Sequence, residues 1–154
     1  ICGLLLTGCV NKQGTELQHK SQSNAPFTWQ NANIYFLLTD RFMNGDPSND
    51  INFNRQNEEA AILRGFMGGD IRGVIQKINE GYFDSLGITA LWITPFFEQI
   101  HGSTDEGTGL TYAFHGYWPR DWTALDPNFG TEEDLAEFVS AAHAHGITRR
   151  LSCP

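Results

Sequence analysis

The sequence has no cysteine between Cys9 and Cys153, and it has few basic residues. The missing central cysteines exclude an internal disulfide framework, and no Cys-x-x-Cys spacing for a metal site exists. Lys and Arg number 10 against 18 Asp and Glu in 154 residues, which gives a net charge of −8. No Lys/Arg cluster interrupts this acidic background, so we expect no nucleic-acid partner.

A long hydrophobic run is also missing, although the chain begins with a short one. Residues 1–8 are apolar, far fewer than the roughly 20 that a membrane-spanning helix needs. They end in Leu6-Thr7-Gly8 before Cys9, which resembles the bacterial lipobox. We therefore interpret residues 1–8 as a truncated lipoprotein signal peptide and expect a lipid anchor on Cys9. The alternative is a first core strand with an incidental cysteine.

The anchor has consequences for location and for the next segment. It would hold the protein on a membrane of the bacterial cell envelope, at the periplasmic or cell-surface face. Residues 9–28 are rich in Asn, Gln, Ser and Lys without a hydrophobic period, so we interpret them as a polar tether.

Alternating strand and helix patterns fill residues 29–147, which we take as one domain. Short apolar runs predict buried strands at Ile34–Leu38 and Ile88–Thr94, separated by a helix that starts at Asp70 and ends at Gly87. Long loops are expected over Thr39–Asn57 and Phe96–Phe129. Strand, helix and strand at this spacing indicate an α/β fold with parallel strands.

A second helix and the start of a third strand complete the pattern. Thr131 is the expected N-cap and Gly146 the expected stop of the helix, and a strand should follow near Ile147. Residues 148–154 show neither strand alternation nor a buried apolar run. We interpret them as an aberrant terminus, and a frameshift near Thr148 is one explanation.

Several ordered motifs between Asn33 and Ile147 resemble glycoside hydrolase family 13, the α-amylase superfamily. They correspond to the first strand, the start of the first helix, the second strand, the loop with substrate aromatics, and the next helix. The motifs are Ile34-Tyr35-Phe36-Leu37-Leu38-Thr39-Asp40-Arg41-Phe42, Gly68-Gly69-Asp70-Ile71-Arg72-Gly73, Leu86-Gly87-Ile88-Thr89-Ala90-Leu91-Trp92-Ile93-Thr94-Pro95, His115-Gly116-Tyr117-Trp118-Pro119-Arg120-Asp121, and Phe129-Gly130-Thr131 with Asp134-Leu135.

This resemblance implies the N-terminal part of a (β/α)8 TIM barrel, incomplete after about three strands, because a whole barrel needs roughly 250 residues. The family acts on α-glucosidic bonds with retention, through a carboxylate nucleophile and a carboxyl acid/base. The resemblance places those groups on the fourth, fifth and seventh strands. No catalytic residue is therefore assigned here, and Asp40 with Arg41 is interpreted as a structural ion pair.

The resemblance also implies a calcium ion, bound like the second calcium of cyclodextrin glucanotransferases. Oxygen donors, which calcium prefers, are dense in the first long loop and at the following helix start. The implied ligands are Asn44, Asp46, Asn49, Asp50, Gly68 and Asp70. The alternative is that these residues only form turns and that Asp70 only caps the helix.

Sugar binding is expected at three residues of the second long loop. Tyr117 and Trp118 offer flat apolar faces for glucose rings, and His115 can donate to a sugar hydroxyl. In the resembling family this tyrosine stacks on the sugar beside the scissile bond. The alternative is that all three side chains pack the loop against the barrel rim.

The leading hypothesis is a calcium-dependent enzyme gene product that acts on α-1,4-glucans such as starch or maltodextrin, with this fragment itself inactive. A cyclodextrin glucanotransferase-like transferase is an alternative within the same chemistry. A surface glucan-binding lipoprotein without catalysis is another, and a non-functional remnant that never folds is a third, because three strands leave two open sheet edges.

Overall fold

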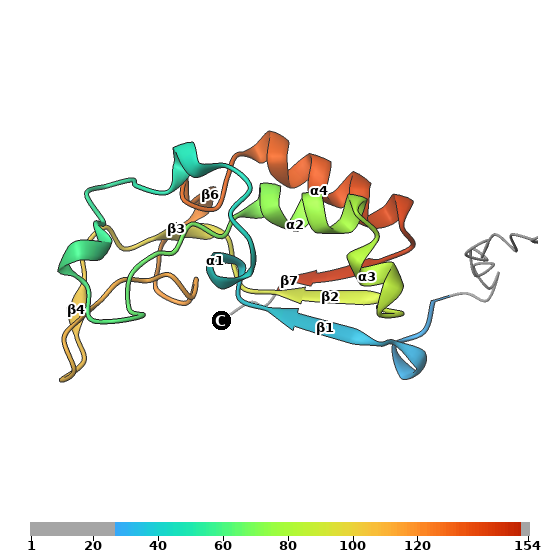
Figure 1. Ribbon diagram of the computed structural model, residues 1–154, viewed down its shortest axis with the longest axis horizontal. Helices are drawn as coiled ribbons and strands as arrows, with labels where there is room; N and C mark the ends of the chain where they lie inside the picture. The colour runs from blue at the N-terminus through green and yellow to red at the C-terminus, as the bar shows by residue number, and fades with distance from the viewer. Residues whose placement is uncertain (1–26, 152–154) are drawn as a thin grey trace, which may run out of the picture.

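Three short parallel strands form the sheet of this protein in a computed structural model that describes residues 27–151 (Figure 1). The strands are β1 (Ile34–Leu37), β2 (Ala90–Ile93) and β7 (Thr148–Leu151), in the spatial order β1-β2-β7. Both neighbouring pairs are parallel, with the first residue of each strand in register. The expected α/β class with parallel strands is therefore confirmed.

Two helices pack against each other on one side of this sheet (Figure 1). Helix α2 (Ile71–Asn79) begins where Asp70 accepts a hydrogen bond from the Gly73 N–H, and α4 (Glu132–Ala144) begins at a capping box between Thr131 and Asp134. Such caps satisfy backbone N–H groups that a helix start leaves unpaired. Both helix starts lie where the sequence predicts them.

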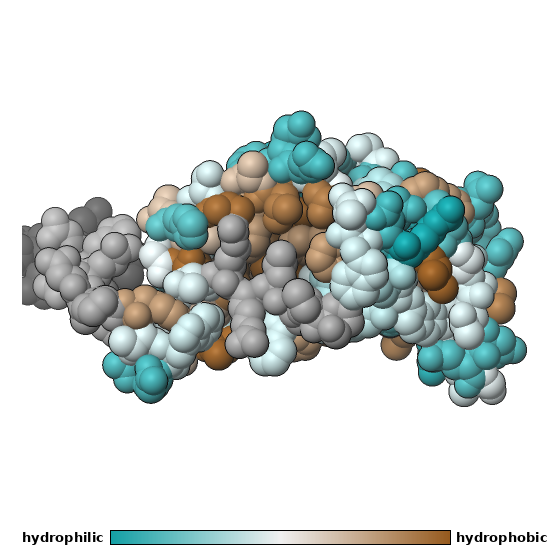
Figure 2. Space-filling view, turned by 180° about the vertical axis from the view of Figure 1, so that it is seen from behind, coloured by the Kyte–Doolittle hydropathy of each residue, from teal (hydrophilic) through white to brown (hydrophobic). Residues whose placement is uncertain are grey.

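The two faces of the sheet differ in burial. Leu37, Leu91 and Ile93 are buried, whereas Phe36 is 50 % and Trp92 is 40 % exposed, and their rings meet edge-on at 5.7 Å. The strands predicted to be buried are therefore buried on one face only in the described residues. The reason is that α2 and α4 cover one face only, and the three strands do not close into a barrel. On the side behind Figure 1, apolar residues gather across the middle between more polar ends (Figure 2).

The helix predicted to run to Gly87 is interrupted. Gly81 adopts a left-handed conformation with φ of 72°, so the chain turns after α2 and a separate short helix, α3 (Tyr82–Ser85), follows. The expected loop after β1 also contains short helical turns, one of which is capped by Asp46 and starts at Pro47. These turns are α1 (Thr39–Phe42), η2 (Pro47–Asn49) and η3 (Asn57–Glu59), and η1 (Trp29–Asn31) precedes β1.

The second long loop is more regular than the sequence suggested. It contains two antiparallel pairs: β3 (Phe97–Gln99) with β6 (Pro119–Leu125), and β4 (Thr104–Asp105) with β5 (Leu110–Thr111). These strands are short and contain no continuous apolar run, and most of their side chains are exposed or half-buried, so the sequence did not indicate them.

The third strand does not stop at Ile147, which corrects the expectation that residues 148–154 lack a strand. β7 pairs with β2 along its whole length, because ladder bonds use backbone groups that Arg149 and Arg150 also possess. The origin of the terminal sequence stays a prediction. Cys9 and most of the predicted tether lie outside the described residues, and within 27–151 no helix is long and apolar enough to cross a membrane.

Candidate functional site

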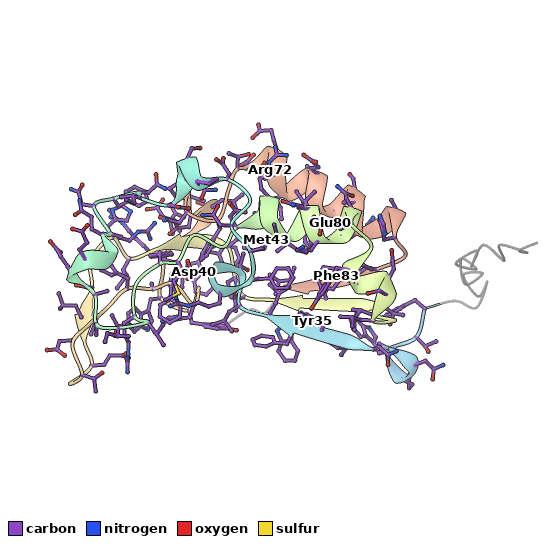
Figure 3. All side chains as sticks on the ribbon, viewed as in Figure 1. Tyr35, Asp40, Met43, Arg72, Glu80 and Phe83 are labelled. Carbon is purple, nitrogen blue, oxygen red and sulfur yellow. The ribbon has the colours of Figure 1, made fainter. Side chains whose placement is uncertain are left out.

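The candidate site lies at the carboxyl ends of the parallel strands. β1 runs into α1, which carries Asp40, and β2 runs into Pro95 and the second long loop. Figure 3 shows Asp40 at this end of β1, whereas Tyr35 and Phe83 lie toward the middle and the start of the sheet. Loops at the carboxyl ends of strands are where open and closed α/β sheets bind ligands.

Asp40 and Arg41 form the expected structural ion pair, with 3.4 Å between Arg41 Nε and Asp40 Oδ2. Asp40 is almost fully buried and accepts hydrogen bonds from the backbone N–H groups of Met67 and Gly68. Burial raises the pKa of its carboxyl to about 6, although those bonds and Arg41 act in the opposite direction. The Arg41 guanidinium lies 3.8 Å from the centre of the Phe114 ring, so this pair joins the two long loops.

The three predicted sugar-binding side chains lie together. The His115 ring stacks on Tyr117 with centroids 5.8 Å apart and an angle of 20° between the planes. Trp118 meets the same imidazole edge-on at 4.8 Å. Tyr117 is 37 % exposed and the other two are half-buried, so an aromatic surface reaches solvent beside the strand ends. We call His115, Tyr117 and Trp118 the aromatic platform.

The hydrogen bonding of His115 determines its tautomer. Its Nδ1 accepts a hydrogen bond of 2.9 Å from the Tyr117 backbone N–H. Burial lowers the pKa of the ring below its ordinary value, and the nearby Glu106 carboxylate only partly opposes this effect. A neutral ring with Nδ1 as acceptor carries its proton on Nε2, which can donate to a hydroxyl group.

Two contacts hold the platform against the end of β2. Gly116 has a φ of 84°, and a Cβ at this position would lie 2.4 Å from the Pro95 carbonyl oxygen, so only glycine permits this approach. The backbone N–H of Trp118 donates to Gln99 Oε1 at 2.8 Å. The platform is therefore fixed to Pro95, which follows β2, and to the Gln99 side chain of β3.

The predicted calcium ligands converge in part. A Cβ on Gly68 would lie 2.4 Å from Asn44 Nδ2 and 2.5 Å from Asp50 Oδ1, so these three residues are in contact. Asn44 and Asn49 each have a buried side-chain oxygen, Oδ1, without a hydrogen-bond partner. Leaving such an oxygen unsatisfied costs about 1–3 kcal/mol, and a cation would supply the missing partner. We call Asn44, Asp50 and Gly68, together with Asn49, which precedes Asp50 in the chain, the oxygen cluster.

Asp46 and Asp70 lie outside the oxygen cluster. Asp46 stabilises a turn and Asp70 caps α2, as the alternative to calcium binding predicts. Asp46 Oδ1 accepts from the Ser48 N–H and hydroxyl, which lowers the pKa of this carboxyl. Asp70 accepts from Gly45 N, Asp46 N, Asn49 Nδ2 and Gly73 N, and these donors occupy both of its oxygens. Within residues 27–151 no three His, Cys, Asp or Glu side chains group as a metal site, so amide and carbonyl oxygens dominate the cluster.

A buried ion pair that the sequence did not reveal lies between the two long loops. Arg55 and Asp126 are completely buried and share two hydrogen bonds of 2.7 and 2.6 Å. The sequence left Asp126 unassigned and gave no signal for Arg55. They lie 71 positions apart and no short motif joins them.

Comparisons with known proteins identify the family of the chain. The family described as "Alpha amylase, catalytic domain" matches residues 36–150. The periplasmic alpha-amylase of Escherichia coli (strain K12) is 49% identical over 149 residues, which cover 94% of this chain and 22% of the relative. The cyclomaltodextrin glucanotransferase of Niallia circulans is 41% identical over 114 residues, 74% of this chain and 16% of the relative. The chain thus spans about a fifth of the length of these relatives.

Solved structures extend the similarity to the fold. The cyclomaltodextrin glucanotransferase CldA superimposes with a TM-score of 0.69 at 36% identity, over 78% of this chain and 24% of that one. An Anoxybacillus alpha-amylase superimposes with a TM-score of 0.64 at 34% identity, over 83% and 25%. These neighbours are TIM-barrel amylases, so the expected barrel relationship is confirmed. The chain belongs to the α-amylase family and corresponds to the N-terminal part of its catalytic domain.

Proposed function

We propose that this chain forms the glucan-binding and calcium-binding N-terminal part of a retaining α-amylase-type glycoside hydrolase that cleaves α-1,4-glucosidic bonds in starch or maltodextrin. The observation that carries this proposal is the aromatic platform at the carboxyl ends of the parallel strands, in a chain of the α-amylase family. Flat aromatic faces and one imidazole donor suit the apolar faces and hydroxyl groups of glucose.

The residues of the platform have separable tasks in this proposal. Tyr117 stacks on a glucose ring, His115 donates from Nε2 to a sugar hydroxyl, and Trp118 supports the imidazole from its edge. None of these groups supplies the carboxylates that retention requires. The 154-residue chain should therefore bind α-1,4-glucan without cleaving it.

Binding of maltoheptaose to the chain, measured by isothermal titration calorimetry, tests this function. Tyr117→Ala should weaken the affinity at least about fivefold, because stacking of this size contributes on the order of 1 kcal/mol or more. Tyr82→Ala is a matched control, since Tyr82 is also 37 % exposed but lies on α3 before β2 begins. Equal affinities of both variants would refute the platform, and release of reducing ends by the chain would refute the proposed lack of cleavage.

We propose further that the oxygen cluster binds Ca²⁺. The unpartnered oxygens of Asn44 and Asn49, the Asp50 carboxylate and the Gly68 carbonyl are the donors that fit, and water would complete six to eight oxygens. Asp70 fixes the first long loop by accepting hydrogen bonds from the backbone N–H groups of Gly45 and Asp46. The ion would tie the first loop to the start of α2, a structural role.

Thermal unfolding with CaCl2 or MgCl2 tests this site. Calcium at 100 times its Kd should stabilise the parent by about 2.7 kcal/mol. Asn44→Ala removes one unpartnered oxygen and should lose most of this gain, whereas Asn79→Ala at the exposed end of α2 should keep it. No calcium-dependent stabilisation of the parent would refute the site.

For location, we propose the cell envelope with a lipid anchor on Cys9. The periplasmic name of the Escherichia coli relative supports the envelope, and the lipobox-like Leu6-Thr7-Gly8-Cys9 supports the anchor. Cys9→Ala should move the protein from the membrane fraction to the soluble fraction of a bacterial host. An unchanged distribution would remove the anchor from the proposal.

A transferase is the second candidate, because the cyclomaltodextrin glucanotransferase of Niallia circulans is 41% identical to this chain over 114 residues. Expression of the gene with its downstream sequence distinguishes the possibilities. Linear products from starch support the hydrolase and cyclic products support the transferase. The absence of the family's carboxylates downstream supports a glucan-binding lipoprotein without catalysis.

A further inference from the structure

The Arg55–Asp126 pair is the centre of a buried polar chain. The Arg55 guanidinium and the Asp126 carboxylate form a bidentate ion pair with two parallel hydrogen bonds. The guanidinium carbon lies 4.5 Å from the centre of the Phe66 ring. This geometry fixes both side chains more firmly than a single hydrogen bond would. A buried ion pair is tolerated only when its remaining hydrogen-bonding groups are satisfied, and here those groups lead toward two different loops.

One branch of the chain reaches the oxygen cluster. Arg55 Nη2 also donates to Asn128 Oδ1, and Asn128 Nδ2 donates to the backbone carbonyl of Asp50. The carboxylate of Asp50 accepts from Asn44 Nδ2 at 2.8 Å. The position of Asp50 therefore depends on the buried pair through one side chain, that of Asn128.

The other branch reaches the aromatic platform. Asp126 Oδ2 accepts from the Gln99 backbone N–H at 2.9 Å, and Gln99 Oε1 accepts from the Trp118 N–H at 2.8 Å. Gln99 is completely buried, and its Nε2 donates to the Phe97 carbonyl, which sets the direction of the amide. The Trp118 backbone is thus linked to the pair through one side chain as well.

We propose that this chain couples the two sites, so that calcium at the oxygen cluster and glucan at the aromatic platform strengthen each other's binding. The proposal rests on the proposed function. Gln99, Asp126 and Arg55 are positioning residues in it, because none of them touches either ligand. Every link is a direct hydrogen bond. The central bonds are buried, and the bonds to Asp50 and Trp118 at the two ends are partly buried, so a shift of Asp50 on metal binding is transmitted to Trp118.

The coupling is measured as the ratio of the maltoheptaose Kd without calcium to that with saturating CaCl2. In the parent chain this ratio should be at least about 5, the lower end of common coupling factors. Gln99→Met is close to isosteric and removes the acceptor for the Trp118 N–H, so its ratio should fall to about 1 while its calcium Kd stays near the parent's. Gln76→Met, at an exposed position of α2, is the matched control and should keep the parent's ratio.

This readout separates coupling from a merely structural role of Gln99. A structural defect would lower the stability, or weaken maltoheptaose binding equally with and without calcium, and would leave the ratio of the two maltoheptaose Kd values unchanged. The reciprocal measurement needs no variant: maltoheptaose must lower the calcium Kd of the parent by the same factor. A maltoheptaose Kd that calcium does not change overturns the coupling and leaves glucan binding intact. No maltoheptaose binding at all overturns the proposed function and the coupling together.

Discussion

Replacing Asp126 with Asn should destabilise the protein far more than its conservative chemistry suggests. The carboxylate accepts four hydrogen bonds, two from Arg55 and one each from the backbone N–H groups of Gln99 and Asn128. Asparagine presents an NH2 group in place of one oxygen, so two of these donors lose their acceptor. The Arg55 charge is then buried without a counter-charge. Breaking a buried pair from one side costs about 3–5 kcal/mol.

Urea unfolding of the 154-residue chain measures this loss. With a slope of about 2 kcal/mol per molar urea, the midpoint should fall by roughly 2 M. Glu106→Gln is the control, because the Arg64–Glu106 pair is similarly short but its side chains are 35% and 41% exposed. An exposed pair contributes at most about 1 kcal/mol. If Asp126→Asn and Glu106→Gln shift the midpoint equally, burial does not determine the strength of this pair and the reasoning is refuted.

Two further changes test the strand ends. Gly116→Ala should cost more than about 1–3 kcal/mol in urea unfolding and weaken maltoheptaose binding, because φ of 84° and the Pro95 carbonyl both oppose a Cβ. Gly102→Ala, with open space around it, is the control and should change neither stability nor binding. Equal behaviour of the two variants would contradict the role of Gly116. The Asp40 pKa of about 6 lies above its ordinary 3.8, so protonation favours the folded state. This contribution is present below pH 4 and is lost as the pH rises through 6, a change of roughly 2–3 kcal/mol. Urea unfolding should show it as a difference between parent and Asp40→Asn, and identical pH profiles would exclude it.

The parts of the fold that repeat a local pattern were predictable. The starts of α2 and α4 were found because Asp70 and Thr131 are short polar caps before amphipathic stretches. The apolar runs around β1 and β2 indicated strands because β-branched and aromatic residues lie between turn signals. The length of α2 was not predictable, since Gly81 tolerates both a helix and the left-handed turn that ends it.

The candidate site was predictable only where a motif is contiguous. His115, Tyr117 and Trp118 belong to one short segment, so the sequence places them together, although only the structure shows the His115 tautomer. The sequence left two roles open for Asp46, turn formation and calcium binding. The spacing of the polar residues does not distinguish between them. The contact of Asp46 with Ser48 is local in sequence. The oxygen cluster, in contrast, forms only when the chain brings Gly68 against Asn44 and Asp50 of the first long loop.

By itself the sequence determined the family, the starts of α2 and α4, the positions of β1 and β2 and the residues of the platform, because these follow from local periodicity, caps and contiguous motifs. Only the tertiary structure decided that Thr148–Leu151 joins the sheet, since backbone pairing with β2 does not depend on side-chain pattern. It alone revealed the chain from Asp50 through Arg55 and Asp126 to Trp118, because its members are distant in sequence and meet only when both loops fold over the strand ends.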